Sequence, residues 1–434
     1  MNNEIINEYL KDICSYVKNK DVHEEISDEI REHLYEIVDE HISDGMSEDE
    51  AVNEAIKRLG SAYECGIKLN KVHKVKPDII TIILSLALAI IGIITIYSIE
   101  KNSISSETFS FDNIIGLIIG AIIAIGIYFF DYRKIKRYSY HIYLAAIIIL
   151  MITSFMADSF FTIKFGRFSE SQISFHLAVT ILLLIALSGV INIKSINNKI
   201  DIIYIGAMGI IPLLLFFIAR DMTVGLIYLS GINVIFLSSK VKRSFKISLI
   251  GVEFVFVILV ILFGVVSEPY RLARFYSLID PARDPKGNGY VNTRIRELLS
   301  KATLYGNEMN VEKFELGDLK SNFTLIYIIS NFGIAFGGIC ISIVMAFVAR
   351  IFTIMNKVKD SYGRTIILSM GSMFFMQIII NMFSNLGFFA VYIGLPFICF
   401  GTINSITSII MIGLLCSIYR RRGLKDRSPA NLQV

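Results

Sequence analysis

The stretch DLKSNFTLIYIISNF, residues 318–332, places polar side chains directly before an apolar helical run. Asp318 carries a carboxylate, a group that can take the proton of a reacting hydroxyl. Asn322 carries an amide, which can orient a hydroxyl by hydrogen bonding but cannot accept its proton. If the helix begins early, Asp318 lies one turn above Asn322 on the same face. The alternative interpretation is a solvated loop acid beside Lys320.

Three further polar residues stand inside or between apolar runs. Asp221 follows Arg220 at a tight polar turn, so its carboxylate either faces a ligand or belongs to a turn that Arg220 partly neutralises. Gln377 and Asn381 are four residues apart in one apolar run. Both should face the protein interior, because lipid cannot satisfy their amides. There they either join helices to one another or contact a substrate.

Arginines gather in the segment 267–322, which carries 9 basic and 8 acidic residues. Because Arg binds phosphate groups with two parallel hydrogen bonds, these side chains are candidate ligands for an anion. The alternative is that the charges of the segment balance one another. The candidates are Arg271, Arg274, Arg294 and Arg296. Proline and glycine turns, followed by the amphipathic helix predicted in TRIRELLSKATL, favour a functional loop over a disordered one.

The composition shows which elements must position these residues. Of the 434 residues 54% are hydrophobic and 18% are charged, and the mean hydropathy is +0.61. Soluble domains have about 45–50% apolar and about 25% charged residues. A helix crosses the hydrocarbon core with about 20 apolar residues. Ten runs meet this length, some after fusing or trimming: 79–98, 113–130, 140–156, 172–191, 202–219, 222–239, 247–266, 323–354, 364–387 and 393–419. The predicted fold class is therefore all-α, a polytopic membrane protein with ten transmembrane helices.

The basic residues set the orientation in the membrane. If residues 1–74 are inside, every inner loop holds Lys or Arg, whereas the short outer loop 99–112 has a net charge of −2. Both termini are then cytoplasmic and 267–322 is a large extracellular loop. The N-terminus lacks a basic stretch followed by an apolar core, so no secretory signal peptide is predicted. None of the five cysteines falls in a predicted outer loop, and neither a disulfide framework nor a CxxC metal site is indicated.

Residues 1–74 have the pattern of a small acidic helical domain. They hold 9 Lys/Arg and 18 Asp/Glu, a net charge of −9, against +13 for the rest of the chain. Asp21 with Glu24 predicts one helix start, and Ser47 with Glu50 predicts a capping box at another. Gly45 and Gly60 end helices, and Ser61 opens a further one. The histidines lack i,i+4 spacing, so no metal site is predicted.

This head resembles the permease prefix (HAAS-like) domain, a helical module that precedes membrane proteins in Gram-positive bacteria. The matching stretches are YLKDICSYV, EIREHLYEIVDEHISDGMSEDEAVNEAIKRLGS and LNKVHK. The resemblance implies a regulatory or protein-binding role for residues 1–74, in a Gram-positive bacterium. The alternative is a solubilising cap without a partner.

Residues 75–422 form the predicted ten-helix membrane domain and are followed by a short cytoplasmic tail at 423–434. Within this domain, residues from about 79 to 419 resemble the SEDS family (FtsW, RodA and SpoVE). These ten-helix proteins polymerise the lipid-linked disaccharide precursor of peptidoglycan. The matching stretches, in order, are FDYRKIKRYSYHIYLAAIII, ARDMTVGLIYL, YRLARFYSLIDPARDPKGNGYVNTRIRELLSKATLYGN and QIIINMFSNLGFFAVYIGLPFICFG. The residues that the resemblance assigns to substrate binding are Asp221, Arg271, Arg274, Tyr290, Arg294, Gln377, Asn381 and Pro396.

The chain departs from the family pattern at its catalytic position. The family writes Thr-Asp-Phe at the start of the eighth helix and uses that Asp as the base, whereas this chain has Ser321-Asn322-Phe323. Two Glu residues inside the same family helix align with Ser330 and Asn331. The resemblance thus implies that Asn322 stands at the catalytic position, with Asp318 as the candidate substitute.

Several functions remain open from the sequence. The first is a divergent member of the family in cell division, cell shape or sporulation, with reduced or absent polymerase activity. It would bind the lipid-linked peptidoglycan precursor or a partner such as a penicillin-binding protein of the division or elongation machinery. The second is an active glycosyltransferase that uses another carboxylate.

The third function is a transporter or lipid flippase. Ion coupling would require intramembrane acids, and the helical cores contain almost none besides Glu253, which argues against a proton-driven pump. Glu253 lies near a cytoplasmic helix end, where snorkelling or a structural partner explains it. None of the three functions requires a cofactor, a divalent cation is compatible with them, and the expected surroundings are a plasma membrane and no nucleic acid.

Overall fold

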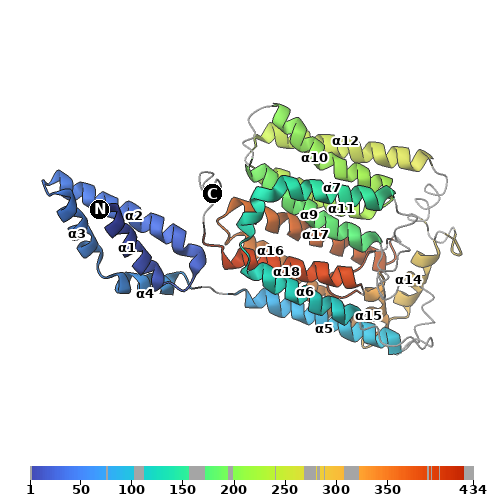
Figure 1. Cartoon of the computed structure of the whole chain (residues 1–434). Coiled ribbons are helices and arrows are strands. Elements are labelled where there is room, and N and C mark those ends of the chain that lie inside the picture. Colours follow the sequence, from blue (N-terminus) through green and yellow to red (C-terminus); the bar gives the residue numbers. More distant parts are fainter. Residues whose placement is uncertain are drawn as a thin grey trace. The chain divides into compact units, whose positions relative to one another are not determined.

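A computed structural model describes residues 2–74, 77–101, 112–155, 172–193, 199–239, 241–267, 280, 284–287, 289–306, 322–388, 391, 393–399 and 401–424. In this part of the chain every regular element is a helix (Figure 1). The chain divides into two compact units. One comprises residues 1–77 and 420–425, and the other comprises 78–419 and 426–434.

The first unit consists of short amphipathic helices around two small cores. Its elements are α1 (Asn2–Ser15), the 3-10 turn η1 (Lys20–Val22), α2 (His23–Ser43), α3 (Glu48–Leu59) and α4 (Ala62–Val72). Apolar residues of α1, α2 and α3, such as Leu10, Leu34 and Val52, form one core. The second core joins α1, α2 and α4 and includes Leu424 from the end of the chain.

Most of the predicted helix caps of this unit are confirmed. The Ser47 hydroxyl accepts a hydrogen bond from the Glu50 backbone N–H, and the Glu50 carboxylate accepts one from the Ser47 N–H. The donor–acceptor distance is 3.4 Å in each. Gly60 ends α3 with a φ of +94°, and Ser61 caps α4. The cap predicted at Asp21 is wrong, because a 3-10 turn precedes α2 and Asn19 caps that turn instead.

The second unit holds long apolar helices, a nine-residue apolar helix and a short amphipathic helix. They are α5 (Ile79–Lys101), α6 (Asp112–Phe129), α7 (Ser139–Phe155) after the 3-10 helix η2 (Tyr132–Tyr138), α9 (Gln172–Ile193), α10 (Lys199–Ile218), α11 (Met222–Ser238), α12 (Arg243–Ser267), α14 (Tyr290–Ser300), α15 (Thr324–Phe332), α16 (Ile334–Met355), α17 (Ser361–Asn385) and α18 (Thr402–Arg420).

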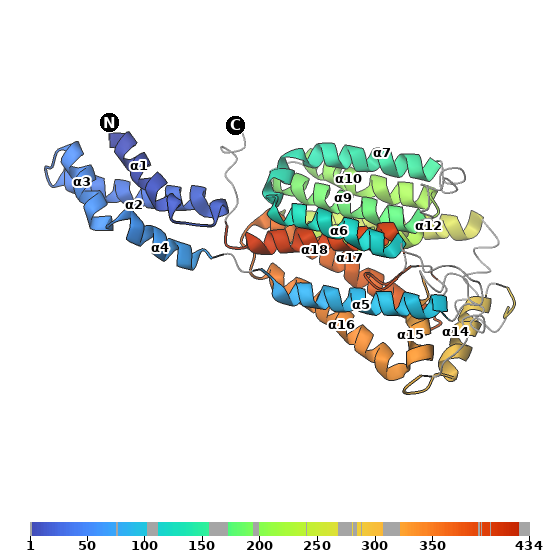
Figure 2. The same ribbon diagram turned by 60° about the horizontal axis from the view of Figure 1, so that its bottom comes forward.

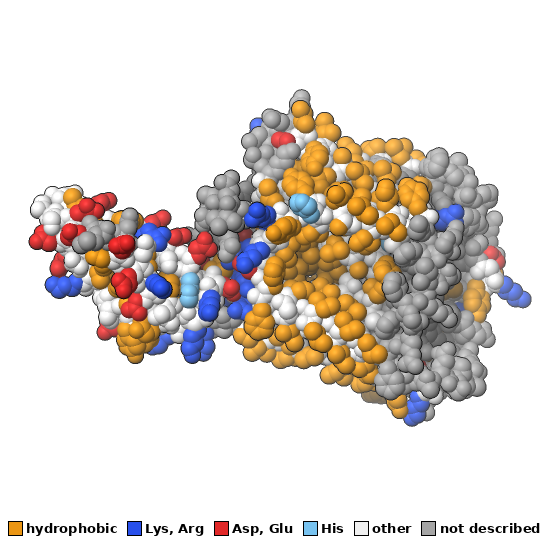
Figure 3. Space-filling view, viewed as in Figure 1, with side chains coloured by type: hydrophobic (Ala, Val, Ile, Leu, Met, Phe, Trp, Pro, Cys, Tyr) orange, Lys and Arg blue, Asp and Glu red, His pale blue; other side chains and the backbone are white. Residues whose placement is uncertain are grey.

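The long apolar helices of the second unit make the chain a multi-pass membrane protein. Among the described residues, seven helical segments are long and apolar enough to cross a membrane, and two shorter apolar helices cover Ile114–Phe129 and Met222–Ser238. Figure 3 shows hydrophobic side chains spread over this unit, with charged ones gathered on the first. The all-α membrane fold is confirmed. Each of the ten predicted runs contains a helix, and ten crossings remain a prediction.

The centre of the second unit is built from α9, α11 and α17. α11 packs along α17 and both contact α9, while α7 covers α9 and α16 lies beside α5 (Figures 1 and 2). In the apolar stretch of α9 that is long enough to cross a membrane, 72% is buried inside the protein. Its residues are apolar around the whole helix, as expected for a helix with neighbours on every side.

Two of the predicted apolar runs are interrupted in the structure. Run 323–354 is divided into α15 and α16 at Gly333, whose φ is +100°. The backbone of residues 303–306 approaches this break so closely that a Cβ on Gly333 would lie 2.4 Å from the carbonyl oxygen of Leu304. In run 393–419 the helix begins only at Thr402. The described residues just before it, 393–399 and 401, are not helical, and the carbonyls of Ile393 and Gly394 accept hydrogen bonds from side chains of α17.

Candidate functional site

One face of α17 carries a row of polar side chains that holds the segment 391–394. Gln377, Asn381 and Ser384 follow one another at the spacing that places residues on one side of a helix. The Gln377 amide donates to the carbonyl of Gly394 over 2.9 Å, and the Asn381 amide donates to that of Ile393 over 2.6 Å. Ser384 donates to the carbonyl of Val391 over 2.8 Å. Both amide side chains face the interior, as predicted.

The next residue of this face, Asn385, caps α15 from a different helix. Its Oδ1 accepts a hydrogen bond of 3.0 Å from the backbone N–H of Ile326, in the first turn of α15. The N-terminal N–H groups of a helix need such acceptors, and the N-cap residue Phe323 offers none from its side chain. α17 therefore positions the start of α15.

The backbone of Asn322 is held by the same two asparagines. Its carbonyl oxygen accepts from Nδ2 of Asn381 and from Nδ2 of Asn385, each over 3.3 Å. The next residue, Phe323, is buried in a core shared with α14. The Asn322 side chain itself is half-buried, and it makes no hydrogen bond with another described residue. We name Asn322, Gln377, Asn381 and Asn385 the amide cluster.

The amide cluster also contains a buried acceptor without a partner. The Nδ2 atom of Asn381 must be the nitrogen, because it contacts two carbonyl oxygens. Its Oδ1 atom is buried and has no hydrogen-bond partner among the described residues. Leaving such a group unpaired destabilises a fold by about 1–3 kcal/mol. The cluster can therefore bind a hydrogen-bond donor, and it holds no group that can remove a proton.

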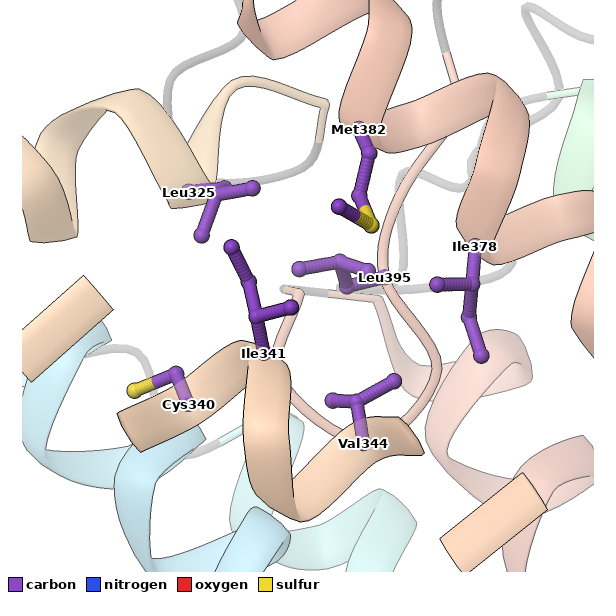
Figure 4. A pocket seen from close by; sticks show the side chains of 7 residues that line it. All are labelled: Leu325, Cys340, Ile341, Val344, Ile378, Met382 and Leu395. Atoms are coloured by element: carbon purple, nitrogen blue, oxygen red, sulfur yellow. The ribbon is translucent and has the colours of Figure 1, made fainter. Parts of the chain in front are cut away.

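A small apolar cavity lies beside the cluster, between α15, α16 and α17 (Figure 4). Its volume is about 10 Å³, roughly the space of one water molecule. Its lining contains no charged or amide side chain: Leu325, Cys340, Ile341, Val344, Ile378, Met382 and Leu395. Ile378 and Met382 precede and follow Asn381 along α17, so the cavity lies next to this member of the amide cluster.

Farther along α15, Ser330 and Asn331, which the sequence resemblance aligns with two family glutamates, are uncharged. Asn331 donates to the hydroxyl of Tyr327 over 2.9 Å and to that of Ser98 on α5 over 3.4 Å. The two hydroxyls are also hydrogen-bonded to each other, at 2.9 Å. Ser330 is buried. This part of α15 is therefore joined to α5 by uncharged hydrogen bonds.

Asp221, a predicted substrate ligand, lies in a separate buried pair. Its Oδ2 atom is 2.8 Å from Nδ1 of His176 on α9, and its Oδ1 atom accepts from the Val224 N–H at the start of α11. The other ring nitrogen of His176 is 3.2 Å from the hydroxyl of Thr153 on α7. His176 is fully buried and Asp221 is 7% exposed. The carboxylate thus joins α9 to the N-terminus of α11.

The outer-loop residues are only partly described. Arg271, Arg274 and Asp318 lie outside the described residues, so their predicted roles stay predictions. Arg294 lies on α14, where its guanidinium is 2.5 Å from Glu297. Tyr290 is the first residue of the same helix and is half-buried.

The amphipathic helix predicted in this loop is confirmed as α14, which packs on α15. Hydrogen bonds from Lys301 and then from Arg294 lower the pKa of Glu297, so this carboxylate is ionised at neutral pH. Arg296 donates to the carbonyl of Gly387 over 3.0 Å and ties α14 to the end of α17.

Pro396 is the last of the predicted site residues, and two polar residues of the interior were not predicted. Pro396 is buried in the turn before Phe397, whose φ is +68°. Among the described residues, no group of three or more His, Cys, Asp and Glu side chains is placed to hold a metal ion. The sequence interpretation missed Asn385, although it lies one helical turn after Asn381. It also missed His176, a single ionisable residue in an apolar run.

Comparison with known proteins gives a family match over most of the chain. The profile of the family FtsW/RodA/SpoVE, described as "Cell cycle protein", matches residues 78–423. A probable peptidoglycan glycosyltransferase FtsW of Trichlorobacter lovleyi is 24% identical over 372 residues, 79% of this chain and 92% of that protein. Stage V sporulation protein E of Bacillus subtilis is 26% identical over 39% of this chain, about half of its own length (48%).

Two solved structures share the fold. One is a chain from work on the structural coordination of polymerization and crosslinking by a peptidoglycan synthase complex. It has a TM-score of 0.63 and 18% identity, over 80% of this chain and 98% of that chain. The other is the rod shape determining protein RodA of Thermus thermophilus, with a TM-score of 0.57 and 15% identity over 80% of this chain and 98% of that one.

Proposed function

Because the chain belongs to the FtsW/RodA/SpoVE family, we propose that it acts in peptidoglycan synthesis as a binding or regulatory protein with little or no polymerase activity. In this proposal its ligand is the lipid-linked peptidoglycan precursor or a partner synthase. The observation that carries the proposal is the amide at position 322. Asn322 takes the place of the family Asp, and Asn381 and Asn385 hold its backbone at the start of α15.

The chemistry of that position argues for binding without transfer. As a glycosidic bond forms, the attacking sugar hydroxyl must lose its proton, and a positioned base typically contributes about 10²–10⁴-fold to the rate. The Asn322 amide can donate a hydrogen bond to this hydroxyl or accept one from it, but it is not basic enough to remove the hydroxyl proton. A precursor can therefore be bound near the N-terminus of α15 without being polymerised.

The other carboxylates give little support to the alternative, an active enzyme that uses a different residue as its base. Asp221 is already bonded to His176 and to the N-terminus of α11 in the interior. Asp318 lies outside the described residues and remains the candidate substitute for the alternative function, an active glycosyltransferase. The two proposals differ in one measurable property, the formation of glycan strands.

The test is to incubate the purified full-length protein with the lipid-linked disaccharide precursor and to separate the products on a gel. We expect wild type to bind the precursor, measured by retention of labelled precursor on the immobilised protein, and to form no strands. Asn322→Asp restores a base at the held position, and strand formation by this variant would identify an otherwise intact site. Asn322→Gln is the matched control, because it changes the side-chain length without adding a base.

Strand synthesis by wild type would contradict the proposal. If the Asp318→Ala variant then formed no glycan strands, the Asp318 carboxylate would be assigned as the base of the reaction. Absence of precursor binding in wild type would leave only the partner synthase as the ligand, and co-purification with a penicillin-binding protein tests this branch.

The proposed setting rests on the family, on the charge pattern and on the resemblance of residues 1–74 to the permease prefix domain. The protein lies in the plasma membrane of a Gram-positive bacterium, with both termini cytoplasmic and the acidic head regulating the membrane unit. Its proposed partners are a penicillin-binding protein and other proteins of division or elongation, a proposal supported by a fold neighbour from a peptidoglycan synthase complex. Binding needs no cofactor, and a divalent cation at the phosphates of the precursor is compatible with it.

A further inference from the structure

Glu253 is a buried acid that the proposed function does not use. It lies on α12 and is 3% exposed, whereas its neighbours Val252, Phe254 and Val255 are exposed by 52–65%. Neither of its carboxyl oxygens has a hydrogen-bond partner among the described residues. Snorkelling to the membrane surface, expected from the sequence, is therefore wrong, and no structural partner is found in the described part of the chain.

The carboxyl group fits into a space that α10 leaves open at a glycine. A Cβ built on Gly209 would lie 3.5 Å from Oε1 of Glu253 and only 2.5 Å from Cδ1 of Ile232. The same position is 3.3 Å from the ring of Phe236. The acid is thus enclosed between the bare backbone of α10 and apolar side chains of α11.

The polar groups nearest to this space are already engaged. Among the described residues, Tyr228 of α11 interacts electrostatically with Glu253 and with Tyr143 of α7. The titratable residues Asp201 and Tyr204 of α10 precede Gly209 by eight and five positions. The Tyr228 hydroxyl donates to the carbonyl of Gly209 over 3.2 Å, and the Tyr143 hydroxyl donates to that of Met208 over 2.8 Å. No described basic side chain forms an ion pair with Glu253.

These surroundings decide which form of the acid is compatible with the fold. A carboxylate without a cation or hydrogen-bond donors is strongly disfavoured in a hydrocarbon environment, whereas a carboxylic acid carries no charge. We propose that Glu253 is a proton-binding site inside the membrane unit, which holds the carboxylic acid form between α10 and α12. Loss of this proton weakens the packing of α12 against α10 and α11.

Such an acid is also a site for covalent modification by a lipid-soluble carbodiimide. The acid proton moves to one nitrogen of dicyclohexylcarbodiimide, and the carboxylate oxygen adds to its central carbon. The adduct then rearranges to a stable N-acylurea, in which all atoms of both reactants are retained. Asp78, bound to Arg350, and Asp221, bound to His176, are buried acids with partners. They provide controls within the same protein.

The test uses the full-length protein in lipid nanodiscs, treated with dicyclohexylcarbodiimide over a series of pH values and analysed by mass spectrometry of peptides. We expect the mass of one reagent molecule on the Glu253 peptide, less of it as the pH rises, and none on the peptides of Asp78 and Asp221. Glu253→Gln should abolish this labelling. A charged, water-soluble carbodiimide should not label Glu253.

A positive control makes a negative result decisive. Val255→Glu places a second acid on the exposed side of α12, where the reagent reaches it from the lipid. Labelling of that residue without labelling of Glu253 would overturn the proposal. Thermal unfolding provides an independent readout: the midpoint of wild type should fall relative to Glu253→Gln as the pH rises. Equal midpoints of the two proteins at every pH would also overturn the proposal.

Discussion

The carbonyl of Asn322 accepts hydrogen bonds from two side chains of a single neighbouring helix, and this geometry would serve an aspartate equally well. Asn381 and Asn385 contact the backbone and leave the side chain at position 322 unengaged by described residues. The backbone at position 322 is thus held independently of the functional group that the side chain carries.

The first prediction at the residue scale concerns Asn385. Asn385→Ala removes the acceptor for the Ile326 N–H and one donor to Asn322, so we expect a loss of about 1–3 kcal/mol of stability for the unpaired buried groups. Hydrogen exchange of α15 amides in the full-length protein measures this. Ser342→Ala on the exposed side of α16 is the control. Equal exchange of α15 in the two variants would contradict the cap.

Glu297 gives a second residue-scale prediction, on pH. The pKa of its carboxylate is lowered in folded α14 by hydrogen bonds from Lys301 and Arg294. Its stabilising effect is therefore complete above the pKa of the unfolded chain, and it is lost as the pH falls through the lowered folded value. We expect α14 amides of wild type to lose protection in acid, after correction for intrinsic exchange. Glu297→Gln should show no such change.

At the scale of elements, the helices begin and end where short polar motifs allow it. The capping box of α3 forms from Ser47 and Glu50, and Gly60 ends the same helix with a positive φ. The break at Gly333 follows another rule. There the approach of residues 303–306, and not a local cap, requires a residue without a side chain.

Ser47→Ala should destabilise α3 specifically. The substitution removes an N-cap acceptor, which typically costs about 1 kcal/mol. Hydrogen exchange of the α3 amides in the full-length protein should accelerate accordingly. Ser15→Ala, which changes an exposed hydroxyl at the end of α1, is the matched control. If both variants exchange alike, the capping box contributes nothing measurable.

At the scale of the whole molecule, the separation of charge predicts the topology. Residues 1–74 carry −9 and the rest of the chain +13, and the excess of basic residues in loops on the cytoplasmic side predicts an orientation with both termini inside. The membrane unit provides the hydrophobic surface that Figure 3 shows. The polar residues of the amide cluster are enclosed between its helices.

This topology predicts which positions a membrane-impermeant maleimide reaches in intact cells. Lys301→Cys, in the outer loop, should be labelled, and Lys357→Cys, between α16 and α17, should be labelled only after the cells are permeabilised. Both lysines are exposed in the structure, so a difference between them reports the side of the membrane. Labelling of position 357 from outside would reverse the orientation.

The sequence alone determined the fold class and the family. These depend on hydropathy runs, loop charge and residue identity, which need no knowledge of tertiary contacts. The capping box was predictable for the same reason, because its two residues are three positions apart. The order of the polar residues along α17 also indicated which face would be buried.

Only the tertiary structure decided how those polar residues are used. Asn385 caps Ile326 across 59 residues, and His176 meets Asp221 across 45. Such pairings depend on which helices become neighbours, and the local pattern does not specify this. Position 333 must be glycine because the backbone of residues 303–306 approaches it closely. The burial of Glu253 likewise depends on the space beside Gly209 of another helix.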